Sequence, residues 1–142
     1  MRLTDLDPQF LRYEEKLDTW EVVDRQPEPG ESASTVPHHT VTAMRDFWPF
    51  VDKIEEAQGI EFLCPKCFAA NGGPIGTHAV VCWSSSRGVP DKAEPGPGRW
   101  ALRGTGFEDL TLDCEPGKSR SVALIGGCAW HGFITNGEVT TA

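Results

Sequence analysis

Two short stretches decide how this chain folds, Cys64-Pro65-Lys66-Cys67 and Cys128-Ala129-Trp130-His131. Each brings two potential metal ligands to one side of a tight turn, because only two residues separate them. Together they supply three thiolates and one imidazole, which is the ligand set of a closed tetrahedral zinc site. The alternative is that the cysteines are buried hydrophobic residues or redox thiols. We predict a structural zinc ion held by Cys64, Cys67, Cys128 and His131.

Length and composition indicate one small β domain. The chain has 142 residues, of which 39% are hydrophobic, with 15 glycines and 11 prolines. This length suits a single domain, which we place over residues 1–142. So many turn-forming residues favour a loop-rich β protein over a helical bundle. We therefore predict a mainly β fold. It would be a compact antiparallel domain stapled by zinc, either a sandwich or a partly open barrel, with one or two short helices.

Charge and hydropathy exclude several classes of partner. The net charge is −8 and the sequence contains no basic run, which argues against nucleic-acid binding. No apolar stretch approaches the length of a membrane span, and residues 1–7 lack the apolar core of a signal peptide. We therefore expect a cytosolic protein that binds neither nucleic acid nor membrane. Thiols stay reduced in a cytosol, so the five cysteines favour a metal over disulfides.

The local patterns predict short strands and two helices. Asp7-Pro8 resembles a helix start, and apolar residues recur at helical spacing after Trp48-Pro49. The end of the chain has the clearest signal, because Asn136-Gly137 between two alternating segments is typical of a β-hairpin with a type I′ turn. Helices are predicted over residues 8–15 and 46–58. Strands are predicted over residues 17–23, 40–43, 60–63, 77–83, 99–103, 110–112 and 121–125, and in the hairpin over residues 133–140.

Two proline-rich stretches, residues 26–37 and 84–98, contain too few apolar residues to build a core. Proline fixes φ and removes a backbone donor, so both favour extended, open conformations. The first lies in an N-terminal extension that we place over residues 1–43. We expect at least one stretch to lie against another subunit through side chains such as Val36 or Val89. The alternative is that both pack on their own domain.

Other residues capable of chemistry have no assigned role. His38-His39 is either a solvated pair or part of a metal site, and the carboxylates between residues 108 and 115 either face solvent or supply a base or a second metal. Cys82 either is buried or joins the site, and Cys114 is a candidate free thiol. The sequence leaves open the roles of His38, His39, His78, Cys82 and Cys114.

The sequence lacks the signatures of several enzyme classes. The zinc deaminase signature requires H-x-E and P-C-x-x-C. Here His78 is followed by Ala79-Val80 and Cys64 is preceded by Leu63, so neither half of the signature is present. Metalloprotease, hydrolase, P-loop and dinucleotide motifs are also absent. We therefore predict no catalytic and no cofactor-binding residues beyond the zinc ligands.

Three segments carry a resemblance to a known family. Residues 3–8 (LTDLDP), 62–65 (FLCP) and 128–139 (CAWHGFITNGEV) resemble an uncharacterised family of zinc-binding β domains from bacteriophages and prophages, often labelled ammonia monooxygenase. The resemblance implies a metal-bearing β domain and no known reaction. The sequence departs from the family pattern at residues 113–117, where a different segment occurs, and residues 26–37 and the segment around Phe50 look like additions.

The resemblance leads to a functional expectation. We expect a non-enzymatic structural or interaction protein that binds neighbouring subunits of a virion, in a decoration, cement or other accessory position. Such a protein would occur in the host cytoplasm and then in the virion. The alternative is a cytosolic, phage-encoded metal-dependent enzyme or host-takeover factor. A purified monomer with a water-bearing zinc would favour the enzyme.

Overall fold

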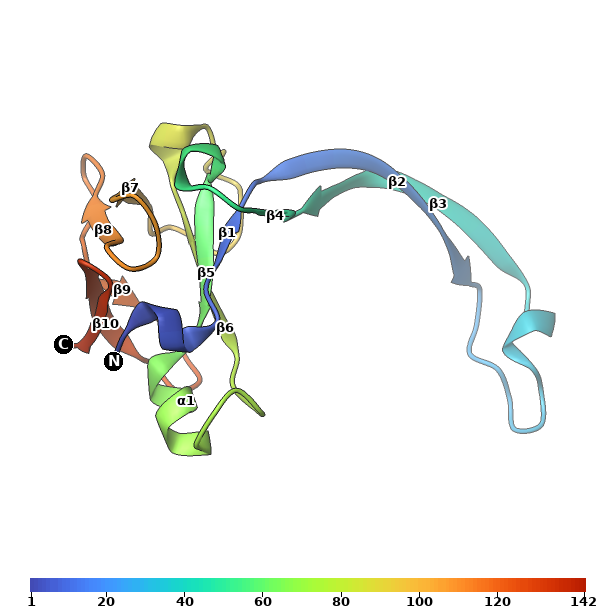
Figure 1. The fold of residues 1–142 in the computed structure, drawn as a ribbon. Helices are drawn as coiled ribbons and strands as arrows, with labels where there is room; N and C mark the ends of the chain where they lie inside the picture. Colours follow the sequence, from blue (N-terminus) through green and yellow to red (C-terminus); the bar gives the residue numbers. More distant parts are fainter. The chain divides into compact units, whose positions relative to one another are not determined.

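A computed structural model describes residues 1–142 as two units (Figure 1). The core unit contains Met1–Tyr13 and Trp48–Ala142, and the hairpin unit is Glu14–Phe47. The strands are β1 (Gln9–Leu11), β2 (Glu14–Val23), β3 (His38–Phe47), β4 (Phe50–Val51), β5 (Gly59–Leu63), β6 (Ala79–Trp83), β7 (Trp100–Arg103), β8 (Thr111–Cys114), β9 (Val122–Ala123), β10 (His131–Thr135) and β11 (Glu138–Thr141). The helices are α1 (Pro65–Asn71) and the short 3₁₀ turns η1 (Leu3–Leu6), η2 (Ala33–Thr35), η3 (Ile54–Glu56) and η4 (Ser85–Arg87).

The core unit is built from antiparallel sheets. One has four strands in the order β4-β1-β5-β6, another has three in the order β11-β10-β9, and β7 pairs with β8. No sheet closes into a barrel. The mainly β prediction is therefore confirmed, including the C-terminal hairpin, in which Asn136 and Gly137 both have positive φ. The single α-helix of the chain has seven residues, and no helix is both long and apolar enough to cross a bilayer.

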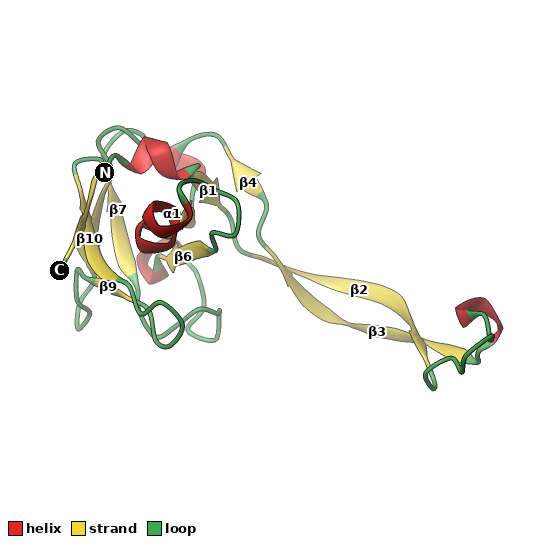
Figure 2. Cartoon of the chain, turned by 90° about the horizontal axis from the view of Figure 1, so that it is seen from below, coloured by secondary structure: helices red, strands yellow, loops and turns green.

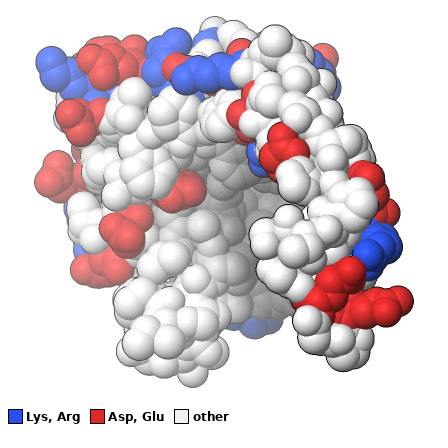
Figure 3. All heavy atoms as spheres, turned by 90° about the vertical axis from the view of Figure 1, so that its right-hand side faces the viewer, with Lys and Arg blue, Asp and Glu red and all other residues white.

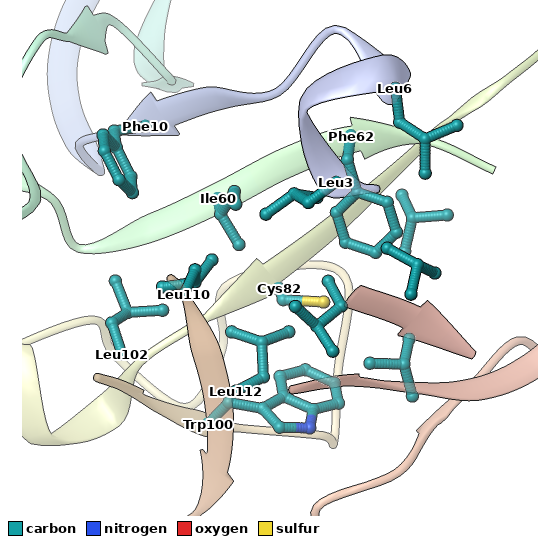
Figure 4. Close-up of a cluster of buried hydrophobic side chains, with 14 of the residues drawn as sticks. Leu3, Leu6, Phe10, Ile60, Phe62, Cys82, Trp100, Leu102, Leu110 and Leu112 are labelled. Carbon is teal, nitrogen blue, oxygen red and sulfur yellow. The ribbon is translucent and has the colours of Figure 1, made fainter. Parts of the chain in front are cut away.

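Strand alternation places the hydrophobic core between these sheets (Figure 4). Ile60 and Phe62 alternate along β5 and face Cys82 and Val80, their partners on β6. All four side chains are buried. They meet residues from the other sheets, and Phe62 makes an edge-to-face contact with Trp130 at a centroid distance of 6.1 Å. Each such side chain contributes roughly 1.5–3 kcal/mol when it leaves water.

Residues 1–13 belong to this core, although they were expected in an N-terminal extension ending at residue 43. Leu3 and Leu6 of η1 are fully buried, and so are Phe10 and Leu11 of β1. The predicted helix over residues 8–15 is absent, because Asp7 adopts a left-handed conformation and β1 pairs with β5. Only residues 14–47 form a separate unit.

The hairpin unit is a two-stranded ribbon (Figure 2). Its ten residue pairs run from Glu14 opposite Phe47 to Val23 opposite His38. The proline-rich residues 26–37 connect β2 to β3, and hydrogen bonds within the hairpin unit hold this connection. Arg25 holds Glu31 through two nitrogen–oxygen contacts of 2.6 and 2.8 Å, which lower the pKa of Glu31. Val36 is 1% exposed, so it cannot make the expected contact with another subunit.

The second proline-rich stretch packs on its own domain. Val89 and Ala93 are buried beside Leu11 and Trp83, so Val89 is also inaccessible to a neighbour. Arg99 anchors this loop from inside, because it is 2% exposed and both terminal nitrogens donate to backbone carbonyls. The accepting carbonyls belong to Pro90, Asp91, Ala93, Pro95 and Gly98.

The predicted helix over residues 46–58 is also absent. Phe50 and Val51 pair with Leu11 and Phe10 as strand β4, and η3 is the only helical turn in this range. The pairing also uses the Pro49 carbonyl, which accepts the N–H of Arg12. The apolar spacing near 3.6 residues predicts a helix here, but pairing with β1 makes the segment a strand.

Replacing Arg99 tests how the 84–98 loop is held. Arg99→Met removes the guanidinium donors from these five carbonyls, of which only that of Pro90 keeps another backbone donor, so we expect the free energy of unfolding to fall by at least about 2 kcal/mol. Arg103→Met is the matched control, because that guanidinium is largely exposed and pairs with Asp113 at the surface. Urea denaturation measures both variants. Equal midpoints for the two would show that Arg99 does not organise the loop.

Candidate metal centre

Four side chains converge in the core unit to form a group that could hold a metal ion. Their ligand atoms all lie within 4.8 Å of one another, and they belong to Cys64, Cys67, His78 and Cys128. The sulfurs of Cys64 and Cys128 are 3.6 Å apart, and the Cys128 sulfur is 3.5 Å from Nε2 of His78. All five cysteines of the chain are free thiols. Three sulfurs and one imidazole nitrogen therefore share one small volume.

The first pair of ligands comes from the start of α1. Cys64 follows β5 directly and is the N-cap residue, Pro65 is the first helical residue, and Cys67 lies in the first turn. Proline is favoured at this position because its φ is already helical and its missing N–H would have no partner. Helix geometry thus places both sulfurs at the same end of α1. Lys66 then donates from Nζ to the Cys128 carbonyl at 2.7 Å, which ties this turn to the distant one.

The imidazole comes from the residue before β6. The antiparallel pairing of β5 and β6 places His78 opposite Cys64, whose N–H donates to the His78 carbonyl at 2.9 Å. Nδ1 of His78 lies 3.3 Å from the Ala79 carbonyl. If Nδ1 carries the proton, Nε2 is left unprotonated and faces the sulfurs. Metal-bound histidines commonly use their second nitrogen in this way, which fixes the tautomer and the ring orientation.

The last ligand sits in a turn that needs unusual backbone conformations. Gly126, Gly127 and Ala129 all have positive φ, at 78°, 55° and 52°. The N–H of Ala129 closes the turn on the Gly126 carbonyl at 3.0 Å. Glycine adopts such conformations without strain, which explains Gly126-Gly127 before Cys128. This turn aims the Cys128 sulfur back toward α1.

The electrostatics of the sulfur cluster favour a bound cation. The pKa of Cys128 is lowered to about 6, chiefly by its hydrogen bond with His78 and next by its hydrogen bond with the Trp130 N–H. Burial and the neighbouring thiols of Cys128 and Cys64 raise the pKa of Cys67 to about 11. One thiolate is thus favoured while an adjacent second one is opposed. A divalent cation removes this opposition, since metal binding deprotonates thiol ligands.

The structure brings together three of the four predicted ligands and supplies His78 in place of His131. Trp130 and Gly132 are buried, so strand alternation turns the intervening His131 to the exposed side of β10. Its ring lies 6.3 Å from that of Phe133. The C-x2-H spacing therefore pointed to the wrong histidine. The signal for His78 was its place at the start of a strand that follows the cysteine knuckle.

The remaining cysteines and histidines lie outside the group. Cys82 is fully buried in the core, which raises its pKa, and Cys114 is exposed on β8. His39 contacts Asp24 at 2.6 Å in the hairpin unit. His38 lies 3.5 Å from a Glu21 carboxylate oxygen. None of these four residues takes part in the metal centre.

The acidic residues between 108 and 115 do not form a second metal site. Asp109 accepts the N–H groups of Thr105 and Gly106, and Asp113 pairs with Arg103. Glu115 is buried, which by itself raises its pKa, but bonds from Ser86 and Ser84 outweigh burial and leave the pKa lowered. These carboxylates therefore stabilise separate turns.

Replacing each of the two histidines in turn by alanine tests which one is a ligand. We expect His78→Ala to lose stoichiometric metal or to weaken its binding by at least about tenfold, because one of four ligands is removed. His131→Ala should bind metal like the intact chain. Cobalt substitution gives the readout, since the visible spectrum of tetrahedral Co²⁺ responds to a lost nitrogen ligand. A spectrum changed by His131→Ala and unchanged by His78→Ala would refute the assignment.

Comparisons with protein-family models, curated proteins and solved structures found no match to this chain. The resemblance of residues 3–8, 62–65 and 128–139 to the phage family is neither confirmed nor refuted by these comparisons and stays a prediction.

Proposed function

We propose that this chain is a zinc-stabilised, non-enzymatic interaction protein that binds neighbouring subunits of a phage particle in a decoration, cement or other accessory position. The observation that carries the proposal is the β2–β3 ribbon, which leaves apolar side chains and both strand edges uncovered. The phage context rests on the sequence resemblance. It implies residence in the host cytoplasm and then in the virion.

The spacing of the ligand atoms supports zinc. A tetrahedral ion with Zn–S near 2.3 Å and Zn–N near 2.0–2.1 Å separates two sulfurs by ~3.8 Å and a sulfur from the nitrogen by ~3.6 Å. The structure has 3.6 Å for Cys64 to Cys128 and 3.5 Å for Cys128 to His78, and all four ligand atoms lie within 4.8 Å of one another. Three thiolates with one imidazole also form a common ligand set of structural zinc.

The ligand count supports a structural rather than a catalytic metal. Catalytic zinc sites use three protein ligands and keep a fourth position for water or substrate. Here Cys64, Cys67, His78 and Cys128 would fill all four positions of a tetrahedral ion. The alternative of a metal-dependent enzyme would require one of them to leave. We therefore propose that the zinc stabilises the fold.

The ribbon has the properties of an interface that lacks its partner. Leu17 and Met44 are directly opposite each other across the strands and are 70% and 58% exposed. A two-stranded hairpin is only marginally stable in water, because it has no second layer to cover its apolar side chains. Its outer edges also present unpaired backbone groups that can accept another strand. A neighbouring subunit would cover both features.

The charge of the ribbon specifies the partner further. Residues 14–47 contain eight acidic and three basic side chains. In the view of Figure 3, acidic side chains are widely spread, whereas basic ones gather mainly along the upper edge. A subunit that presents basic residues around an apolar centre would complement the ribbon and be steered toward it. We therefore propose a basic rather than an acidic surface on the neighbouring subunit.

Leu17→Glu tests the proposed interface in the full chain. Tagged protein isolated from phage-producing cells should sediment in a complex larger than a monomer, and Leu17→Glu should release it as a monomer, because a charge replaces the apolar contact. Ile75→Glu is the matched control, since Ile75 is equally apolar and 90% exposed but belongs to the core unit. Metal content and circular dichroism confirm that each variant is folded.

Two results would contradict the proposal. One is an intact chain that sediments as a monomer from those cells. The other is a folded Leu17→Glu variant that stays in the complex to the same extent as Ile75→Glu.

A further inference from the structure

A groove of about 690 Å³ lies within the core unit between β6 and β9. Both strands end their sheets, β6 in the four-stranded sheet and β9 in the three-stranded one. Apolar side chains make up much of the lining, among them Val80, Trp100, Val122 and Leu124. Its volume falls within the range of about 300–1,000 Å³ that is typical of ligand sites.

The β6 edge presents unpaired backbone groups to this groove. The Cys64 N–H donates to the His78 carbonyl and the Ser84 N–H donates to the Gln58 carbonyl, one residue beyond each end of β5. These bonds fix the alternation of the antiparallel ladder between β5 and β6. The backbone N–H and C=O groups of the even-numbered residues between His78 and Ser84 therefore point toward β5, and those of Val81 point away from it. No backbone group elsewhere in the chain pairs with Val81 on this side. Val81 lines the groove, so an extended strand laid there would find a donor and an acceptor.

The opposite edge has the same property. The N–H of Leu124 donates to the Trp130 carbonyl, so the backbone groups of its neighbour Ala123 point away from β10. Ala123 also lines the groove. Open strand edges thus border the groove on two sides.

The lining selects an uncharged occupant. It contains no Asp, Glu, Lys or Arg, and its titratable groups, His78 and Cys128, both belong to the metal centre. A charged side chain entering the groove would lose water without gaining a partner. Ser119 and Ser121 offer hydroxyl groups that suit a peptide backbone or small polar side chains.

The metal centre forms one end of the groove. His78 precedes β6 and Cys128 lies in the loop between β9 and β10, and both line the groove as well as the metal centre. Joining them through one ion would fix the separation of the two edges. Ile125, which is 94% exposed, lies on the groove in the same loop.

From these features we infer that the groove binds an extended, uncharged peptide segment of a partner protein, which adds as a strand to β6. The alternating side chains of the segment would be small, apolar or β-branched. This site is separate from the hairpin unit, so it would give the chain a second means of attachment.

The test uses the metal-loaded full chain and an array of blocked hexapeptides composed of Ala, Val, Ile, Thr and Ser. We expect binders with dissociation constants below about 1 mM. Methylating alternate backbone nitrogens of the best binder should abolish binding, because strand addition needs those donors. On binding, the Val81 amide should become protected from hydrogen exchange.

A matched pair of variants locates the site. Ile125→Lys should weaken binding by at least about tenfold, since it places a charge on the uncharged groove. Ile75→Lys should leave it within about twofold, because that isoleucine is similarly exposed and also lies three residues before a metal ligand, but does not line the groove. Retained cobalt spectra show that both variants are folded.

Several outcomes would overturn the inference. They are the absence of any binder at about 1 mM, equal binding of the methylated peptide, and equal weakening by the two variants. Self-association that is lost in Ile125→Lys, without peptide binding, would instead assign the groove to a second copy of the chain.

Discussion

Three sulfur atoms and one imidazole nitrogen lie within 4.8 Å of one another, and we propose that the core unit depends on an ion held between them. The ligands come from the start of α1, the residue before β6 and the turn before β10. One ion would therefore connect the four-stranded sheet to the three-stranded sheet. In the unfolded chain the cysteines of the two turns are about sixty residues apart and form no site. The free energy of metal binding would for that reason become free energy of folding.

The local signals that were predicted correctly are those that tertiary contacts support. Alternation along β5 and β6 and the Asn136-Gly137 turn all appear as expected, and the C-x2-C pair does lie on one turn. The helical pattern after Trp48 failed because β1 takes that segment as a partner strand. Helix α1 was missed, although Pro65 at its start and Gly72 after its end are standard boundary residues.

The choice of histidine could not be made from spacing alone. A histidine two residues after a knuckle turn is a ligand only if the chain keeps turning, and here β10 begins at that residue. Burial of Trp130 then directs His131 outward. His78 is defined as a ligand only by the register of β5 with β6, which is a non-local property. The ribbon is also a non-local feature, because it forms by pairing of two segments that the sequence predicted only as separate strands.

Removing the metal from the intact chain tests the central claim most directly. Thermal unfolding would be followed by near-ultraviolet circular dichroism, because Trp83, Trp100 and Trp130 are all buried in the core unit. If the centre holds this unit together, a zinc chelator should abolish the cooperative transition, and added Zn²⁺ should restore it, while Cys64→Ser shows no transition in either state. A chelated protein that is shown to be metal-free and keeps its melting temperature would contradict the account.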